Sequence, residues 1–113
     1  MFDFKKLIVY QKARDFALTT TELLADNTFD KTVNDQLRRA SLSIMLNIAE
    51  GSSRFSNKDR KNFMVVARGS AFECSGIFDF LQARKLISTE VQLTMDNQLE
   101  EISKMLYALI KTG

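Results

Sequence analysis

Apolar residues recur along this chain at alternating spacings of three and four, which is the period of an amphipathic α-helix. The pattern starts at about residue 4 and continues to about residue 24, where the turn-forming run ADNTFD, residues 25–30, ends it. It predicts a first helix of about six turns. One face of this helix carries Val9, Ala13, Phe16, Thr20 and Leu23.

Three further helical segments follow, over about residues 31–50, from just after residue 56 to about residue 85, and from about residue 89 onward. Each begins beside a side chain that can accept a hydrogen bond from the free amide groups of a first helical turn. These predicted caps are Asp30 or Thr32 for the second segment, Ser56 for the third, and Ser88 or Thr89 for the fourth.

Turn-forming residues are scarce outside the short connections, and the chain has no proline. Gly51 follows the second segment, where a left-handed residue commonly ends a helix. Gly69 and Gly76 lie inside the third segment, where we expect them to allow a close approach of a neighbouring helix. Short connections make sequential helices antiparallel neighbours. We therefore predict one all-α domain over residues 1–113, an antiparallel up-down-up-down four-helix bundle.

The second and third segments carry more apolar surface than a bundle uses. Apolar side chains sweep about 240° of the second segment, whereas a bundle helix needs a stripe of about 100–140°. Only Arg38 and Ser41 interrupt this arc. The third segment is apolar on a second side, through Met64, Ala71 and Phe78. Apolar surface beyond what the bundle core buries favours self-association. The alternative is that other helices of the same chain cover both sides of these two helices.

Basic charge gathers in the middle third of the chain. The net charge is +2, but residues 36–72 carry seven Lys/Arg against two Asp/Glu, whereas residues 1–35 carry five against six and residues 73–113 four against six. A basic patch attracts phosphate, and a solvated helix face has the same composition. The residues that we expect to contact RNA or DNA surround the connection after Gly51: Arg54, Lys58, Arg60 and Lys61.

The connection SIMLNIAEGSSRFSNKD, residues 43–59, lacks the features of catalytic or phosphate-binding loops. The phosphate-binding P-loop of nucleoside triphosphatases needs several glycines and a Gly-Lys-Ser/Thr triplet, whereas this stretch has one glycine and no such triplet. The chain has no histidine, so Ser52 and Ser53 have no imidazole base. Cys74 lies in an apolar stripe, as a buried cysteine does. We predict no catalytic residue, no metal and no cofactor.

Several polar residues are predicted to hold the fold together rather than to bind a ligand. We expect Arg39 to pair with Glu50 or Glu73, and Arg38 to pair with an acid at an interface. Asn47 is expected to bond the backbone or a neighbouring helix. The alternative for the two glutamates is a carboxylate pair acting as general acid and base. The full structural set is Arg38, Arg39, Asn47, Glu50, Arg68 and Glu73.

No apolar run in the sequence is long enough for a membrane-spanning helix. The start, MFDFKKL, lacks the order of charged, apolar and small residues that makes a secretory signal. A single cysteine cannot form an internal disulfide, which fits a reducing compartment. We expect a cytoplasmic protein with no membrane partner.

Three stretches of the chain resemble a known family. They are QKARDFAL (11–18), QLRRASLSIMLNIAEGSSRFS (36–56) and ARGSAFE (67–73), and they are similar to the four-helix-bundle proteins encoded in intervening sequences of bacterial 23S ribosomal RNA genes. The resemblance covers nearly the whole chain. Tyr10 stands where the family commonly has Trp, Met45 where it has Pro, and Ser75 where it has the second acid of an E-L-E motif.

The resemblance implies a cytoplasmic bundle that assembles into a ring-shaped homopentamer. It also implies kinship with the accessory proteins of diversity-generating retroelements, which look like basic pentamers that bind nucleic acid and a reverse transcriptase. Members of the family are sometimes labelled ribosomal proteins because of where their genes lie. Gene location is not evidence of a place in the ribosome.

Two classes of function follow from the sequence. The first is a non-enzymatic oligomer that binds RNA or DNA electrostatically through the arginine-rich loop and helix ends. The second is a small enzyme that uses Glu50 and Glu73 with nearby arginines, and a purely structural oligomer with a protein partner is a further alternative. Contact with nucleic acid is expected to be mainly electrostatic, because Phe55 beside Arg54 is the one aromatic residue clearly interleaved with the basic ones.

Overall fold

The computed structural model describes residues 2–27 and 29–112, and it is helical along nearly all of them. A short 3-10 helix, η1 (Asp3–Lys6), precedes four α-helices: α1 (Ile8–Asp26), α2 (Lys31–Gly51), α3 (Asn57–Ala83) and α4 (Thr89–Lys111). No strand occurs within these described ranges. The prediction of an all-α chain with four main helices is confirmed.

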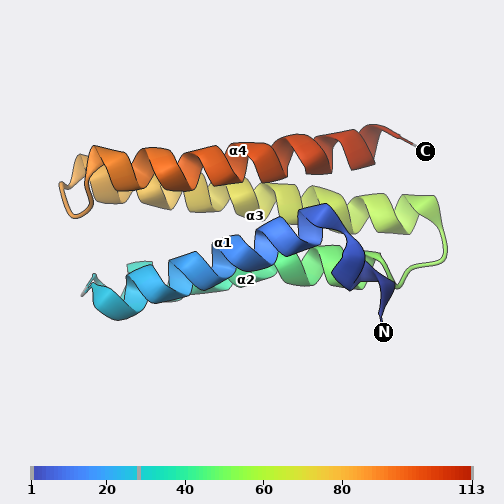
Figure 1. The fold of residues 1–113 in the computed structure, drawn as a ribbon, viewed down its shortest axis with the longest axis horizontal. Coiled ribbons are helices and arrows are strands. Elements are labelled where there is room, and N and C mark those ends of the chain that lie inside the picture. Colours follow the sequence, from blue (N-terminus) through green and yellow to red (C-terminus); the bar gives the residue numbers. More distant parts are fainter. Residues whose placement is uncertain (1, 28, 113) are drawn as a thin grey trace.

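The four helices form an elongated bundle with extents of 44 × 25 × 21 Å. Each helix packs against the next along the chain, and contacts between α1 and α4 close the bundle. Figure 1 shows α3 and α4 above α1 and α2, with successive helices running in opposite directions. The loop between α2 and α3 lies at the same end as η1 and the last turn of α4, at the right of Figure 1. We call this the loop end.

The predicted capping residues are confirmed, and the structure chooses between the alternatives. The Asp30 carboxylate accepts a hydrogen bond of 2.7 Å from the Thr32 amide at the start of α2. Ser56 accepts from the Asp59 amide at the start of α3, and Ser88 accepts from the Val91 amide at the start of α4, both at 3.1 Å. Because a cap needs only neighbouring residues, the sequence contains enough information to place it.

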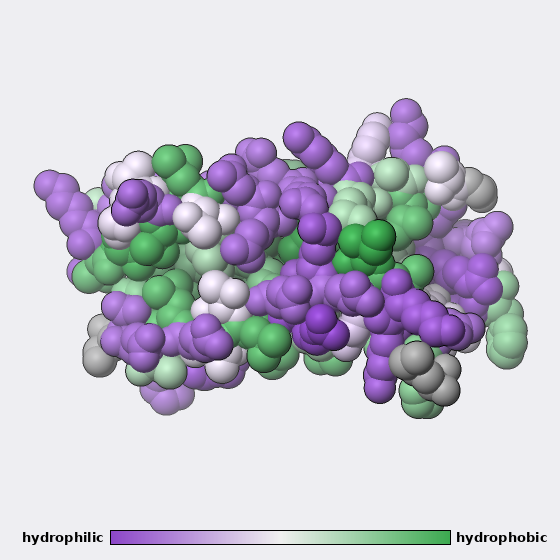
Figure 2. All heavy atoms as spheres, viewed as in Figure 1, coloured by the Kyte–Doolittle hydropathy of each residue, from purple (hydrophilic) through white to green (hydrophobic). Residues whose placement is uncertain are grey.

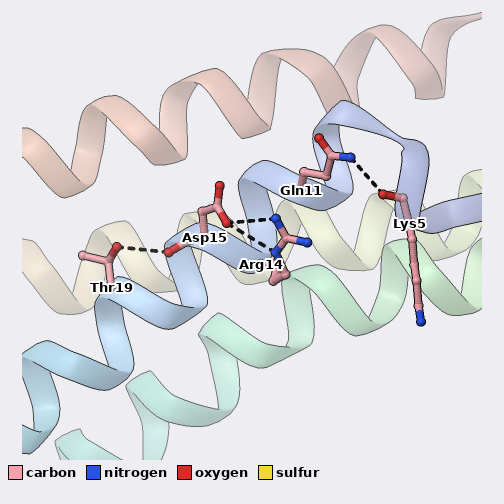
Figure 3. Close-up of polar contacts among 5 residues, drawn as sticks. All are labelled: Lys5, Gln11, Arg14, Asp15 and Thr19. Atoms are coloured by element: carbon pink, nitrogen blue, oxygen red, sulfur yellow. Dashed lines mark hydrogen bonds and ion pairs between the residues drawn. The ribbon is translucent and has the colours of Figure 1, made fainter.

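The start of the first helix was predicted wrongly, because the chain is not continuously helical from residue 4. Leu7 is extended, with φ −69° and ψ 128°, and it separates η1 from α1. The side-chain Nε2 of Gln11 donates a hydrogen bond of 2.9 Å to the Lys5 carbonyl, which ties η1 back onto α1 (Figure 3). Further along α1, Arg14 pairs with its neighbour Asp15 at 3.2 Å (Figure 3).

The core contains the apolar stripes of all four helices. Phe16 of α1 meets Phe78 of α3 edge to face, with ring centroids 6.3 Å apart, and both side chains are fully buried. Aliphatic residues from the other helices fill the space around them, among them Leu37, Ile44, Ile48, Ile102 and Leu106. None of the helices in residues 2–27 and 29–112 combines the length and the apolar character that crossing a membrane requires.

Gly51 does not take the left-handed conformation that we predicted. It is the last residue of α2, and the right-handed Ser52 follows it as the C-cap. A Cβ atom on Gly51 would lie 2.8 Å from Cβ of Phe63 and 3.0 Å from Cε of Met64, both on α3. Glycine is required here because α3 passes close to the end of α2, which is a tertiary contact rather than a turn requirement.

Among the described residues other than glycine, positive φ occurs instead at Lys85, just after α3, at 61°. The Lys85 amide donates to the Gln82 carbonyl and the Leu86 amide to the Leu81 carbonyl, which is the Schellman arrangement of a helix end. An added Cβ on Gly69 or Gly76 would meet no atom within 4 Å, so the expected close approach of a helix to them is absent within residues 2–27 and 29–112.

Candidate nucleic-acid interface

The loop between α2 and α3 is short and closed by local hydrogen bonds. The Ser52 hydroxyl donates to the Ile48 carbonyl at 2.9 Å, and the Ser53 hydroxyl donates to the Glu50 carbonyl at 2.7 Å. The Arg54 amide donates to the Gly51 carbonyl at 3.2 Å. The two serine hydroxyls therefore end α2, and neither is placed as an activated nucleophile.

Arg54 is the most constrained of the four predicted contact residues. Its Nη2 lies 3.1 Å from Oε1 of Glu50, and its guanidinium stands 4.6 Å above the centre of the Phe63 ring. The Glu50–Arg54 pair is half exposed, so solvent screens it. Arg54 thus helps to join the end of α2 to the start of α3, and a nucleic acid would have to compete with Glu50 for it.

Arg60 is oriented by the loop and leaves part of its guanidinium free. Its Nε donates to the Arg54 carbonyl at 2.8 Å, and its Nη1 donates to Oδ1 of Asn57 at 3.2 Å. No acceptor within the described residues binds its Nη2. An arginine held in this way can donate a hydrogen bond to a ligand with little further loss of side-chain conformational entropy on binding.

Two lysines lie beside Arg60 near the start of α3. We call the three residues the loop-end cations: Lys58, Arg60 and Lys61. Within residues 2–27 and 29–112, no carboxylate lies within 4.0 Å of any of the three. All three lie in the first turns of α3, and Lys58 and Arg60 are exposed. In Figure 2, hydrophilic residues spread over much of the visible face and extend to the right-hand end, which is the loop end.

Arg38 and Arg39 lie about 18 Å further along α2 from the loop and do not join this group. Nη1 of Arg38 lies 3.7 Å from Oδ1 of Asp35, and the pair is exposed. Asp35 also binds Lys31 at 2.9 Å, and this hydrogen bond and charge raise the pKa of Lys31 and lower the pKa of Asp35. Arg39 is exposed and has no ion pair among the described residues.

Asn47 links α2 to α3 through two serines that the sequence did not single out. Its side-chain Nδ2 donates to the backbone carbonyl of Ser43 at 2.8 Å and to the Ser43 hydroxyl at 3.0 Å. The Ser43 hydroxyl in turn lies 2.8 Å from the Ser70 hydroxyl of α3. The spacing of Ser43 and Asn47 could have suggested their contact, whereas the partner on α3 depends on the helix register.

The Ser43–Ser70 hydrogen bond also shows how far apart Glu50 and Glu73 lie, the two glutamates considered as a general acid and base. Glu50 is seven residues beyond Ser43 toward the loop, and Glu73 is three residues beyond Ser70 in the opposite direction. At 1.5 Å per residue they are separated by about 15 Å along the bundle. The two carboxylates do not form a pair, and Glu73 lies level with Arg39 without an ion pair to it.

Arg68 lies at one end of a groove of about 470 Å³ between α3 and α4. Its guanidinium stands 4.7 Å above the Phe72 ring and 5.5 Å from the Tyr107 ring, and its buried Nε has no hydrogen-bond partner in the described chain. Further along the groove, the Ser75 hydroxyl donates to Asp96 at 2.8 Å. The sequence did not reveal this groove, because it depends on how α4 lies against α3.

No curated protein matches this chain. Among solved structures, it is similar to the crystal structure of a protein with unknown function from the S23 ribosomal protein family of Bacteroides thetaiotaomicron VPI-5482. The two are 28% identical, the match covers 93% of this chain and 100% of the other, and the TM-score is 0.87. Residues 5–108 match the family model described as 23S rRNA-intervening sequence protein. The resemblance found in the three sequence stretches is thereby confirmed, and the chain belongs to the 23S rRNA-intervening sequence protein family.

Proposed function

We propose that this protein is a non-enzymatic, cytoplasmic homo-oligomer that binds RNA or DNA through the loop-end cations. The observation that carries the proposal is that Lys58, Arg60 and Lys61 share one end of the bundle without a carboxylate within 4.0 Å among the described residues. Elsewhere in the described chain, Lys12 pairs with Glu101 and Lys31 with Asp35. Other cations that have no ion pair there, such as Arg39, Arg84 and Lys85, lie away from the loop end. Unpaired cations concentrated at one place favour a polyanion as ligand.

Binding of this kind is electrostatic and tolerant of sequence. Each phosphate that a cation neutralises releases counterions, so the affinity falls as salt is added. Three contacts per subunit predict a slope of about −2 to −3 in a plot of log affinity against log salt concentration. A ring of five subunits, as the family resemblance implies, repeats the three cations and steepens this dependence.

Self-association is supported by apolar side chains that the single chain leaves in solvent. Leu42 and Leu46 of α2 are 39% and 55% exposed, and Phe72 of α3 is 58% exposed beside the α3–α4 groove. We propose that the outer face of α2 in one subunit packs into the α3–α4 groove of the next. The two surfaces differ, so the contact is head-to-tail, and such contacts close into rings when the rotation permits.

The enzyme alternative receives no support from the geometry. Glu50 is paired with Arg54, and Glu73 lies about 15 Å away along the bundle, too far for two carboxylates to act on one bond. The cytoplasmic location rests on the single cysteine, which is free and buried.

Fluorescence anisotropy with a labelled RNA tests nucleic-acid binding. The variant K58Q/R60Q/K61Q removes the three loop-end cations, and the matched control K31Q/R84Q/K85Q removes three exposed cations at the opposite end. We expect the first variant to lose both affinity and salt dependence and the control to keep them. Equal loss in both would show non-specific attraction to net charge, and no loss in either would refute the proposal.

Sedimentation equilibrium at micromolar concentration tests assembly. We expect an oligomer, with a pentamer as the first expectation. The variant L46D places a charge on the outer face of α2 and is expected to dissociate the oligomer. The matched control is L18D, because Leu18 is 57% exposed on α1, outside both proposed surfaces. A clean monomer mass for the unmodified chain would refute the assembly, and equal effects of the two variants would refute its location.

A further inference from the structure

A hollow of about 380 Å³ opens at the loop end, beside the loop-end cations. It lies between the N-terminal segment, the start of α3 and the end of α4, and its size falls in the range of pockets that bind small ligands. The surface of its lining is mostly apolar, and its polar side chains include two basic ones and one carboxylate, that of Asp3, which lies 4.0 Å from Nζ of Lys6. The residues that matter here are Phe4, Leu7, Met64 and Leu109 as apolar walls, with Arg60 and Lys61 as the cations.

The apolar walls leave hydrocarbon in contact with water. Leu7 and Leu109 are 39% and 41% exposed, although both line the hollow. A flat, weakly polar group placed against them would remove this surface from water, which is favourable in proportion to the area covered. The hollow is therefore suited to a ligand with an apolar planar body.

The two cations favour a ligand that carries negative charge close to its planar body. Arg60 is held by its bonds to the Arg54 carbonyl and to Asn57, and its Nη2 remains available within the described structure. Lys61 is the next residue and lines the same hollow. A nucleotide joins a planar base to a phosphate at this short distance, and arginine and lysine are the usual donors to phosphate.

Phe55 provides an independent indication of the same ligand. Its side chain is 99% exposed, and it lies in the loop between Ser52 and Asn57, which both line the hollow. Aromatic side chains beside cations serve as stacking platforms for the unpaired bases of single strands. Phe55 thus offers an exposed aromatic ring in the loop that borders the hollow.

We propose that the loop end binds single-stranded nucleic acid in preference to a duplex. One unpaired base enters the hollow, its phosphate is bound by Arg60 and Lys61, and a neighbouring base stacks on Phe55. This inference rests on the proposed function and narrows it, because paired bases in a duplex are stacked on one another and unavailable to the hollow. Single-stranded RNA and DNA share the chemistry that the site requires.

The absence of tryptophan from the chain supplies a direct test. The variant F55W introduces a single tryptophan, whose fluorescence is quenched when a base stacks on it. We expect quenching by a single-stranded 12-mer of RNA or DNA and none by a duplex of the same sequence. The F55A variant is expected to bind the single strand about tenfold more weakly, whereas F80A, which removes a half-exposed Phe from the other end of α3, is expected to bind as the parent does.

A second pair of variants tests the hollow itself. L109Q makes one wall polar and is expected to weaken single-strand binding while leaving duplex binding unchanged. L93Q is its control, because Leu93 is 56% exposed on the same helix and lies outside the hollow. Equal affinity for the two forms of nucleic acid, with no quenching of F55W, would overturn this inference. The proposed function would survive that result if K58Q/R60Q/K61Q still lowered the affinity, and a parent chain that bound neither form would overturn both.

Discussion

Substitution of Gly51 by alanine tests the contact between the end of α2 and the start of α3. The structure shows why glycine occupies this position: an alanine Cβ would lie 2.8 Å from Cβ of Phe63 and 3.4 Å from the Arg60 carbonyl oxygen. Cβ of Phe63 is attached directly to the backbone of α3 and cannot turn away as the end of a side chain does. The two helices must therefore separate locally to admit a methyl group.

The magnitude follows from two opposing effects. Carbon atoms in contact prefer separations of about 3.5 Å or more, so the contact with Phe63 is short by about 0.7 Å. Overpacking of this kind costs about 1–3 kcal/mol. Alanine has the better helix propensity by at most about 1 kcal/mol, and less at the final residue of a helix. The expected net result is a loss of about 1–2 kcal/mol in the free energy of unfolding, or a fall of about 5–10 °C in Tm.

Thermal and urea unfolding followed by circular dichroism at 222 nm will measure this change. All variants are compared at one chain concentration, because assembly would couple stability to concentration. Gly69→Ala and Gly76→Ala are the matched controls: both glycines lie inside α3, and an added Cβ meets no atom within 4 Å. Each control is expected to stabilise the chain by up to about 1 kcal/mol through helix propensity alone.

The reasoning would be refuted if G51A were as stable as the parent or more stable, while the control variants behaved as expected. Such a result would mean that α3 can move away from α2 at no cost. A loss of stability in the control variants would have a different meaning, since it would place another subunit against the open face of α3.

Four further predictions concern three sites outside the loop end. Lys85→Gly should raise stability by about 1 kcal/mol in urea unfolding, because glycine adopts φ 61° without the cost that a side chain adds, and Lys85→Ala should bring no such gain. Burial, with a smaller contribution from the neighbouring negative charge, raises the pKa of Cys74 to about 12, so the folded thiol should resist alkylation at pH 8 until denaturant is added. Because the thiol's pKa is higher in the folded than in the unfolded chain, the folded state keeps a proton that the unfolded state loses between about pH 9 and 12. Over this range the free energy of unfolding of the parent should therefore fall with pH more steeply than that of Cys74→Ala, by up to about 1.4 kcal/mol per pH unit. A double-mutant cycle of Ser43→Ala and Ser70→Ala should give a coupling energy of about 1 kcal/mol, and additive effects would contradict the bond between them.

The sequence by itself determined the features that depend on neighbours in the chain. The four main helices, their caps at Asp30, Ser56 and Ser88, and the three motif stretches all follow from residues within a few positions of one another. The bundle follows as well, because short connections between amphipathic helices leave few other arrangements. The prediction failed within this local range at residues 4–7, where the break at Leu7 leaves no mark in the apolar pattern.

Only the tertiary structure decided which residues of different helices meet. The close contact of Gly51 with Phe63, the bond between Ser43 and Ser70, the α3–α4 groove and the hollow at the loop end all depend on the register of one helix against another. Helical periodicity identifies the buried face of each helix but leaves its displacement along the bundle axis open. That displacement is set by the packing of side chains from several helices at once, and no short stretch of sequence contains this information.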